Sequence, residues 1–163
     1  MPTSSRHLLT FVNLTTRPDK RNLSGLVYYR SKYIAMKGII MKVIATANAP
    51  AAIGPYSQAL VVGNLVLTSG QVGIDLGTGK LPEGLEAQAH QVFNNIAAIL
   101  DAAGTDMSKV VKTTVFIKDM NDFGKVNEIY AKYFTEPYPT RSCVEVARLP
   151  KDALIECEVI AEL

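Results

Sequence analysis

The amino-acid sequence predicts an α+β fold, with six strands in one sheet and two helices packed on one face of that sheet. Two observations carry this prediction: six β-rich runs lie between turn signals, and two segments have apolar residues at helical spacing. In chain order we expect one strand, two strands, a helix, a strand, a helix and two strands. This order is typical of a two-layer domain.

The first three predicted strands cover residues 42–46, 57–62 and 65–69. Gly63-Asn64 separates the second from the third, and such a pair between β-rich runs predicts a tight hairpin. Residues 75–84 hold three glycines and a proline, so we expect a surface loop there.

The clearest predicted helix covers residues 85–103. Its apolar residues recur at spacings of three and four and form one stripe, namely Leu85, Ala89, Val92, Phe93, Ile96, Ile99, Leu100 and Ala103. Gly104 follows where glycine often ends a helix. A second helix is expected from Asn121 or Asp122, either of which can cap it, to about Phe134.

The last three predicted strands cover residues 109–118, 141–147 and 154–162. The final strand alternates, with Ile155, Cys157, Val159 and Ala161 on one face and Glu156, Glu158, Ile160 and Glu162 on the other. We expect Val144, Val146 and Val159 on the face without helices. An apolar bare face of this kind usually leads to oligomers.

Charge divides the chain into a leader, residues 1–40, and a body, residues 41–163. The leader has seven basic residues and one acid, whereas the body has ten basic and fourteen acidic residues and a net charge of −4. An acidic body argues against a surface that follows nucleic-acid phosphates. We expect the leader to lie outside the fold, either as extra translated sequence before a start at Met36 or Met41, as an organellar transit peptide, or as a real appendage.

Several common sites are excluded by the residues themselves. No apolar stretch is long enough for a membrane span, and two cysteines with two histidines make no plausible zinc cluster. The free thiols fit a reducing compartment. The sequence GTGK at 77–80 is better explained as a tight turn than as a phosphate loop, and His90 as an ordinary helix residue.

Two charged side chains remain as candidates for chemistry. Arg141 opens a strand after a proline-containing loop, where a guanidinium could hold a carboxylate through two parallel hydrogen bonds. Glu156 lies in an otherwise apolar strand, and partial burial would raise its pKa toward neutrality. By spacing alone, a solvated strand-end arginine and a polar outer face of an edge strand are the simpler explanations of the two residues.

Four segments together resemble the RidA/YjgF family, the reactive intermediate deaminases. They are AAIGPYSQ at 51–58, TSGQ at 68–71, VKTTVFIKD at 111–119 and RSCVEVARLPKD at 141–152, the last closely followed by Ile155-Glu156. The resemblance covers residues 42–163 without a gap. Two departures are visible: Thr140 stands where alanine is common, and Gly73 where proline is frequent.

The resemblance implies a chorismate-mutase-like (YjgF-like) six-stranded mixed sheet, assembled as a homotrimeric barrel with ligand clefts between subunits. It implies hydrolysis of reactive 2-imino and enamine acids, such as 2-aminoacrylate/2-iminopropanoate and 2-iminobutanoate, to 2-keto acids and ammonia. No cofactor, metal, membrane or nucleic acid is expected. The expected location is the cytoplasm, or an organelle if the leader is a transit peptide.

The same resemblance assigns roles to residues. Arg141 would clamp the substrate carboxylate, and Glu156 would orient a water and carry protons to the departing nitrogen. The remaining substrate-binding candidates are Tyr56 closing the cleft, Ser69 and Gly70 on its floor, Asn127 at its border and the backbone around Cys143.

Two other functions stay open at this point. One is an endoribonuclease that inhibits translation, which the acidic body and the lack of catalytic histidines disfavour. The other is a non-catalytic ligand-binding regulator of amino-acid or purine metabolism, which would use Arg141 without turnover.

Overall fold

A computed structural model describes residues 33–36 and 39–163 of the chain. The strands are β1 (Tyr33–Met36), β2 (Ile39–Ile44), β3 (Ala59–Val62), β4 (Leu65–Thr68), β5 (Gln71–Val72), β6 (Val110–Ile117), β7 (Thr140–Glu145) and β8 (Ile155–Glu162). The helices are α1 (Leu85–Ala103) and α2 (Phe123–Tyr130), and the short 3-10 turns are η1 (Met107–Lys109), η2 (Met120–Asp122) and η3 (Pro150–Asp152).

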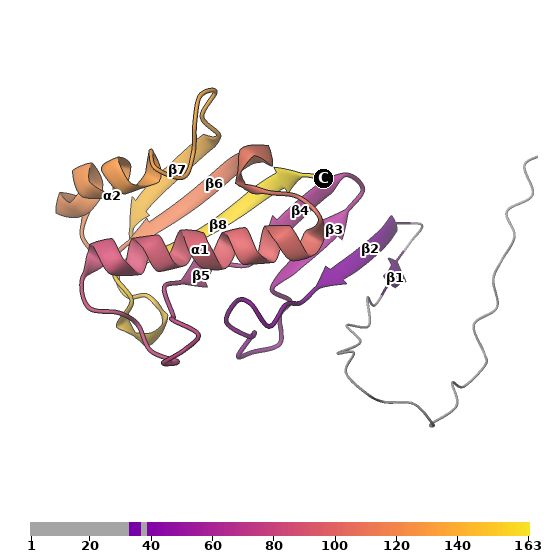
Figure 1. Ribbon diagram of the computed structural model, residues 1–163, viewed down its shortest axis with the longest axis horizontal. Helices are drawn as coiled ribbons and strands as arrows, with labels where there is room; N and C mark the ends of the chain where they lie inside the picture. The colour runs from indigo at the N-terminus through magenta and orange to yellow at the C-terminus, as the bar shows by residue number, and fades with distance from the viewer. Residues whose placement is uncertain (1–32, 37–38) are drawn as a thin grey trace, which may run out of the picture.

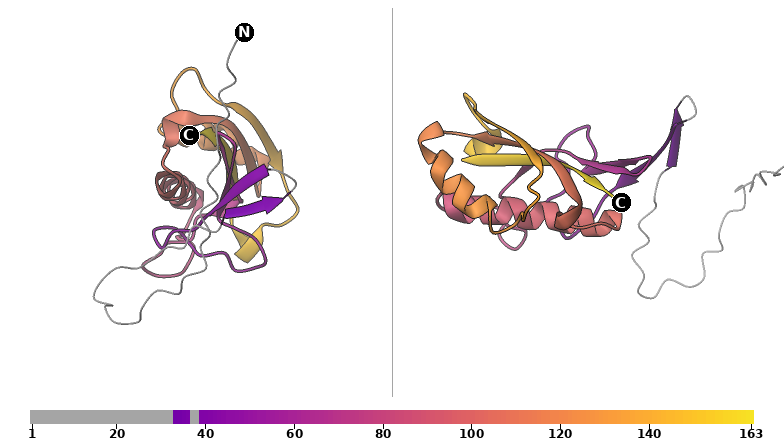
Figure 2. Two further views of the ribbon diagram at one scale, coloured as in Figure 1. Left: turned by 90° about the vertical axis from the view of Figure 1, so that its right-hand side faces the viewer. Right: turned by 90° about the horizontal axis from the view of Figure 1, so that it is seen from above.

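All eight strands belong to one mixed sheet. Its order is β1-β2-β3-β4-β8-β6-β7, with β5 paired to β8 beside this path. The β6–β7 pair is parallel, and the other pairs are antiparallel. Both helices lie on the same side of the sheet, as the view from above in Figure 2 shows. The predicted α+β class with two helices on one face is therefore confirmed.

The sheet has more strands than the six we predicted. The six expected strands are all present, but β5 and β1 are added to them. β5 has only two residues, too few for an alternating pattern to be visible in the sequence. β1 falls within the leader, of which residues 1–32 and 37–38 lie outside the described part of the chain. The placement of residues 1–40 outside the fold therefore stays a prediction.

The core lies between α1 and the sheet (Figure 1), and the predicted stripe of α1 is buried throughout. Gly104 ends the helix with a φ of 93°, and its N–H donates to the carbonyls of Leu100 and Asp101. Within the described residues no helix is long and apolar enough to cross a membrane.

The second helix begins differently from our expectation. Neither Asn121 nor Asp122 caps it through a side chain; instead Asp119 accepts a hydrogen bond from the Asn121 N–H and caps η2, which leads directly into α2. α2 is also shorter than predicted, because the chain leaves the helix after Tyr130 in a series of turns.

The alternation of β8 is confirmed, but one assignment of faces is wrong. Ile155, Cys157, Val159 and Ala161 are buried, and they face the helices. Val159 therefore belongs to the covered face and not to the bare one, where Val144 remains 43% exposed. The sequence shows which residues of a strand share a face, but a helix has to be placed before the covered face is known.

Candidate functional site

Strand register places the two main candidates, Arg141 and Glu156, on opposite faces of the sheet. Arg141 is the β7 partner of Thr113, which is fully buried on the helix face. Glu156 is the β8 partner of Phe116, and its burial alternates with that of Ile155 and Cys157. Because successive side chains of a strand point to opposite faces, the two groups diverge within one chain.

Arg141 is held against α2. Its guanidinium donates to the side-chain oxygen of Asn127 at 2.6 Å, and its central carbon lies 4.6 Å from the ring centre of Tyr130 and 5.5 Å from that of Phe123. Tyr130 is in turn fixed by a 2.9 Å hydrogen bond to the buried hydroxyl of Thr113. Aromatic faces attract a guanidinium while leaving N–H groups available to an anion.

A hollow of about 380 Å³ opens beside this guanidinium. It is lined by Asn127, Tyr130, Ala131, Tyr138, Pro139 and Arg141. The cation, a side-chain amide and aromatic rings share one opening, which suits the carboxylate end of a small molecule. Arg141 and Asn127, two of the predicted site residues, thus lie together.

A second cavity, of about 330 Å³, contains four other predicted residues: Tyr56, Ser69, Gly70 and Glu156. Its remaining wall is mostly apolar and includes Ile53, Val72, Ile74, Pro50 and Pro150. Gly70 lies directly against the acid, since a Cβ built on it would stand 1.8 Å from the Glu156 Oε1. Only glycine leaves room for that carboxylate in its present position.

The environment of Glu156 favours its protonated form. Burial raises the pKa of its carboxyl above the usual value, and the nearby charge of Glu158 raises it further. A carboxyl whose pKa is raised in a small cavity is suited to accept a proton and return it during a reaction. The expected rise in pKa is present, but its cause differs from the one we gave. The apolar neighbours of Glu156 along its own strand face the other side of the sheet, and the apolar side chains of the cavity come from other segments.

Tyr56 and Ser69 shape the mouth and floor of this cavity. Tyr56 is 47% exposed, and its hydroxyl accepts a hydrogen bond from the Ile53 N–H at 3.3 Å. The Ser69 hydroxyl donates to the carbonyl of Ser57 at 2.7 Å and so joins the end of β4 to the segment before β3. Both oxygens keep a lone pair for a ligand, and the tyrosine keeps its proton to donate.

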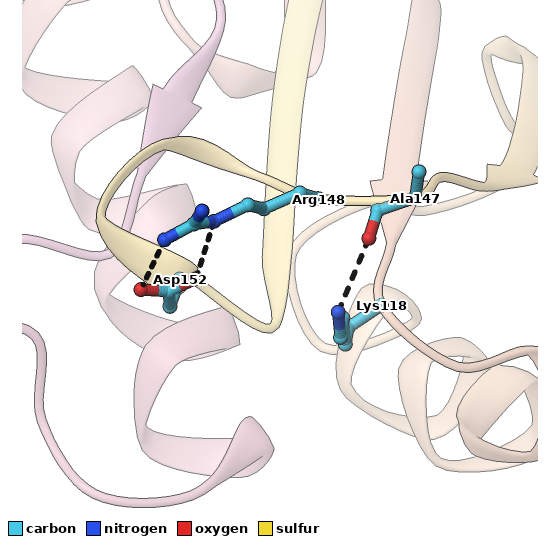
Figure 3. A network of polar contacts seen from close by, with 4 residues as sticks. All are labelled: Lys118, Ala147, Arg148 and Asp152. Atoms are coloured by element: carbon cyan, nitrogen blue, oxygen red, sulfur yellow. Dashed lines mark hydrogen bonds and ion pairs between the residues drawn. The ribbon is translucent and has the colours of Figure 1, made fainter.

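The loop between β7 and β8 forms one wall of the cavity through Pro150 and Lys151. Figure 3 shows how it is held: the Arg148 guanidinium donates to both carboxylate oxygens of Asp152, at 2.7 and 3.0 Å, and Lys118 donates to the Ala147 carbonyl. Lys151 and Asp152 have φ values of 57° and 58°, in the left-handed region that is costly for residues other than glycine. Strain of this kind is typical of loops that form functional sites.

Cys143 follows Arg141 by two residues and shares its face, packed against the core. Burial raises the pKa of its thiol, so the sulfur is not a ready nucleophile. This fits a contribution through the backbone. Among the described residues, no group of histidine, cysteine and acidic side chains is arranged to hold a metal ion.

One chain thus gathers the predicted residues into two sets and does not bring the sets together. One set, Tyr56, Ser69, Gly70 and Glu156, lines one cavity, and the other set, Arg141, Asn127 and Cys143, lies on the other face. We call these two sets the half-sites. The sequence could not show this separation, because it depends on the register of β7 and β8 against β6.

The sequence analysis missed Gln58, which fixes the other rim of the Glu156 cavity. Its side chain is only 4% exposed, accepts from the Thr46 N–H and donates to the carbonyls of Thr46, Ala49 and Pro50. The available signal was a lone amide beside a β-rich run and a proline-containing loop. A buried amide in such a place must find backbone partners.

Comparisons with known proteins agree with this architecture. The family model described as Endoribonuclease L-PSP matches residues 46–163. A 2-iminobutanoate/2-iminopropanoate deaminase of Escherichia coli (strain K12) is 55% identical over 123 residues, which are 74% of this chain and 96% of the relative.

Two solved structures extend the comparison. RidA from the Antarctic bacterium Psychrobacter sp. PAMC 21119 has a TM-score of 0.72 at 50% identity, over 74% of this chain and 98% of that one. E. coli TdcF with bound serine has a TM-score of 0.71 at 48% identity, over 75% of this chain and 98% of that one. The residues matched by the family model contain strands β3 to β8, both helices and both candidate half-sites, and the chain belongs to the RidA/YjgF family, described in the matching model as Endoribonuclease L-PSP.

Proposed function

We propose that this protein is a hydrolytic deaminase that converts small 2-imino acids, such as 2-iminopropanoate and 2-iminobutanoate, to 2-keto acids and ammonia. The observation that carries the proposal is the 55% identity to a relative named for this reaction, over 96% of that relative's length. The chain also has the two groups that the chemistry needs. Arg141 is a fixed cation beside an open hollow, and Glu156 is an acid of raised pKa in a cavity.

In the proposed reaction, Arg141 binds the substrate carboxylate and so fixes the adjacent C2=N carbon. Glu156 accepts a proton from a water as its oxygen adds to C2, which gives a tetrahedral intermediate. The acid then delivers that proton to nitrogen, which gives a carbinolamine. The C–N bond breaks as the new hydroxyl passes its proton through Glu156 to the departing nitrogen, so that C2 becomes a carbonyl and ammonia leaves. Water supplies the oxygen, and no electron changes hands. The substrate is held in place and one acid transfers each proton.

The positions of Arg141 and Glu156 bear on the assembly. A small imino acid is too short to reach both groups through one sheet, so each cleft would combine Arg141 of one subunit with Glu156 of its neighbour. The face of the sheet without helices exposes Leu67 and Val144 by 39% and 43%, and apolar surface of this kind favours self-association. We therefore include a homotrimer with shared clefts in the proposal.

Mixed oligomers test the shared cleft. Arg141→Ala and Glu156→Gln should each be inactive alone, yet co-expressed in equal amounts they should regain about a quarter of wild-type activity. A quarter follows because each cleft draws one group from each of two randomly chosen subunits. Ammonia release, with the imine generated in the assay by a serine or threonine dehydratase, is the measurement.

The two parent variants, mixed after separate purification, are the control and should stay inactive if subunits do not exchange. Co-expressed oligomers that remain inactive would contradict the shared cleft. Folded wild-type protein that releases no ammonia beyond the spontaneous rate would contradict the deaminase itself.

The description of the matching family model makes endoribonuclease activity the second candidate. The net charge of −4 over residues 41–163 opposes RNA binding, and neither half-site offers several cations in a row. We expect no RNA cleavage by the pure protein. Salt-dependent cleavage that disappears in Arg141→Ala would favour the second candidate instead.

A further inference from the structure

Two amides lie beside the predicted apolar stripe of α1, and both are buried. Gln88 is 6% exposed and Asn95 is 1% exposed. Seven residues separate them, which is close to two helical turns, so they lie on the same side of the helix. Buried amides on such a face need hydrogen-bond partners, and their partners show what they do.

Asn95 holds the segment that follows β5. Its side-chain nitrogen donates to the carbonyl of Val72 at 3.2 Å and to that of Ile74 at 3.1 Å, while its oxygen accepts from Gln91 at 2.8 Å. The two N–H groups of the Asn95 amide therefore each donate to a carbonyl at the end of β5 or just after it, that of Val72 and that of Ile74. β5 lies directly beside α1 in Figure 1.

Gln88 holds the chain on the other side of Glu156. Its side-chain oxygen accepts from the Leu154 N–H at 2.8 Å, two residues before Glu156, and its nitrogen donates to the Pro82 carbonyl at 3.0 Å. Gly73 allows the segment after β5 to pack closely against α1, since a Cβ there would stand 2.5 Å from the Gln88 carbonyl oxygen. Backbone thus packs on backbone between α1 and the end of β5.

These contacts converge on Glu156. Val72 is its direct cross-strand partner in the β5–β8 pair, so the Val72 side chain stands beside the carboxylate. Val72 and Ile74 also belong to the apolar wall of the cavity. A movement of this segment would change both the position of the acid and its exposure to water.

From this geometry we infer that Asn95 is a positioning residue for the reaction, because it fixes the β5 segment against which Glu156 is placed. Gln88 assists it by fixing Leu154. The inference rests on the proposed function, in which Glu156 transfers the protons. Neither amide lines the cavity, so neither is expected to touch the substrate.

The test compares Asn95→Leu with wild type. Leucine has nearly the shape of asparagine but cannot donate, so the variant should fold while the Val72 and Ile74 carbonyls lose their partner. We expect kcat to fall by about tenfold to a hundredfold, because small displacements of a reacting group have effects of this size. KM should change by less than about threefold, because Arg141 still holds the carboxylate.

Ile99→Val is the matched control. Ile99 lies one turn further along α1 and is fully buried, and this change removes one methylene without removing a hydrogen bond. It should lower the Tm by an amount similar to Asn95→Leu and leave kcat unchanged. If the two variants lose stability alike and kcat alike, Asn95 has only a structural role and the inference is wrong.

A readout that needs no turnover separates this inference from the proposed function. In Asn95→Leu the NMR-measured pKa of the Glu156 carboxyl should fall toward its usual value as water enters beside β5. The other ionisable groups near Glu156 are Glu158 on its own strand, Lys151 of η3 and Tyr56 across the cavity. The Asn95→Leu variant substitutes none of these three residues. An unchanged pKa would overturn the inference even if the protein proves to be a deaminase.

A second variant covers the case in which Asn95→Leu does not fold. Gly73→Ala keeps both amides but pushes the same segment away from α1, because its Cβ meets Gln88 backbone atoms at 2.5 to 3.0 Å. Like Asn95→Leu, it should lower both kcat and the pKa of Glu156. Wild-type kinetics in this variant would also contradict the inference.

Discussion

The surroundings of Arg141 stabilise its charged form, whereas those of Glu156 destabilise its charged form. Arg141 lies between aromatic rings and an amide oxygen, which stabilise a permanent cation while leaving part of it free. Glu156 lies among apolar side chains and near Glu158, which destabilise its anion and raise its pKa. One region is suited to hold a charge and the other to exchange a proton.

The two regions also differ in what fixes them. Side chains of α2 hold Arg141, whereas backbone segments and a glycine define the place of Glu156. Substitutions around Arg141 should therefore act mainly on substrate binding. Substitutions around Glu156 should act mainly on the rate of the bound substrate, and this difference can be measured.

The largest effect is expected from Arg141→Ala. Without the guanidinium the substrate carboxylate loses its paired hydrogen bonds, so kcat/KM should fall by at least about a hundredfold. Arg141→Lys should recover part of this loss, since an ammonium keeps the charge but not the forked geometry. Ammonia release measures both, with light scattering to show that the assembly is intact. If the kcat/KM of the alanine variant is within threefold of wild type, Arg141 does not bind the substrate carboxylate.

A smaller effect is expected from Gly70→Ala, which acts on the other region. The new Cβ would occupy the place of the Glu156 Oε1, 1.8 Å away, and the flexible end of that side chain can turn aside without unfolding the protein. We expect kcat to fall by about tenfold with little change in KM or Tm. Gly124→Ala in α2 is the control, since its Cβ meets nothing within 4 Å. A Gly70→Ala variant with wild-type kcat would show that the present position of the carboxylate does not matter.

The contrast between the regions also separates what the sequence could predict from what it could not. The α1 stripe, its Gly104 end and the Gly63-Asn64 hairpin all follow from local periodicity or turn chemistry, and the structure has each of them. The pairing of Arg141 with Asn127 joins residues fourteen positions apart and needed the placement of α2 on the sheet.

The position of Glu156 depended even more on tertiary structure. Its cavity combines residues from 50 to 156, and its neighbour Val72 belongs to a strand of two residues that no periodicity reveals. The misplacement of Val159 has the same origin, since alternation defines two faces without saying which one is covered. Resemblance could name the residues of the site, but the division between two faces required coordinates.

A modest effect on stability is expected from Glu156→Gln as the pH changes. The folded protein raises the pKa of Glu156 above its ordinary value, so it binds this proton more tightly than the unfolded chain does. Stability from this group is therefore present below the unfolded pKa and is lost as pH rises through the folded one. Glutamine cannot ionise, so the variant should gain Tm relative to wild type from pH 4 to pH 8. A constant difference in Tm across this range would mean that the acid is not destabilised in its charged form.

The smallest effect is expected when residues 1–40 are removed. Both half-sites are built from residues 50–156, so kcat/KM and the number of subunits in the assembly should equal those of the full chain. Removal of residues 1–32 alone is the matched comparison, because it keeps β1 paired with β2. The shorter truncation should match the full chain in Tm. The longer one should lose at most a few degrees, because β2 loses both its neighbour β1 and its own first two residues. If only the longer truncation becomes monomeric or inactive, β1 belongs to the working fold and the domain begins before residue 41.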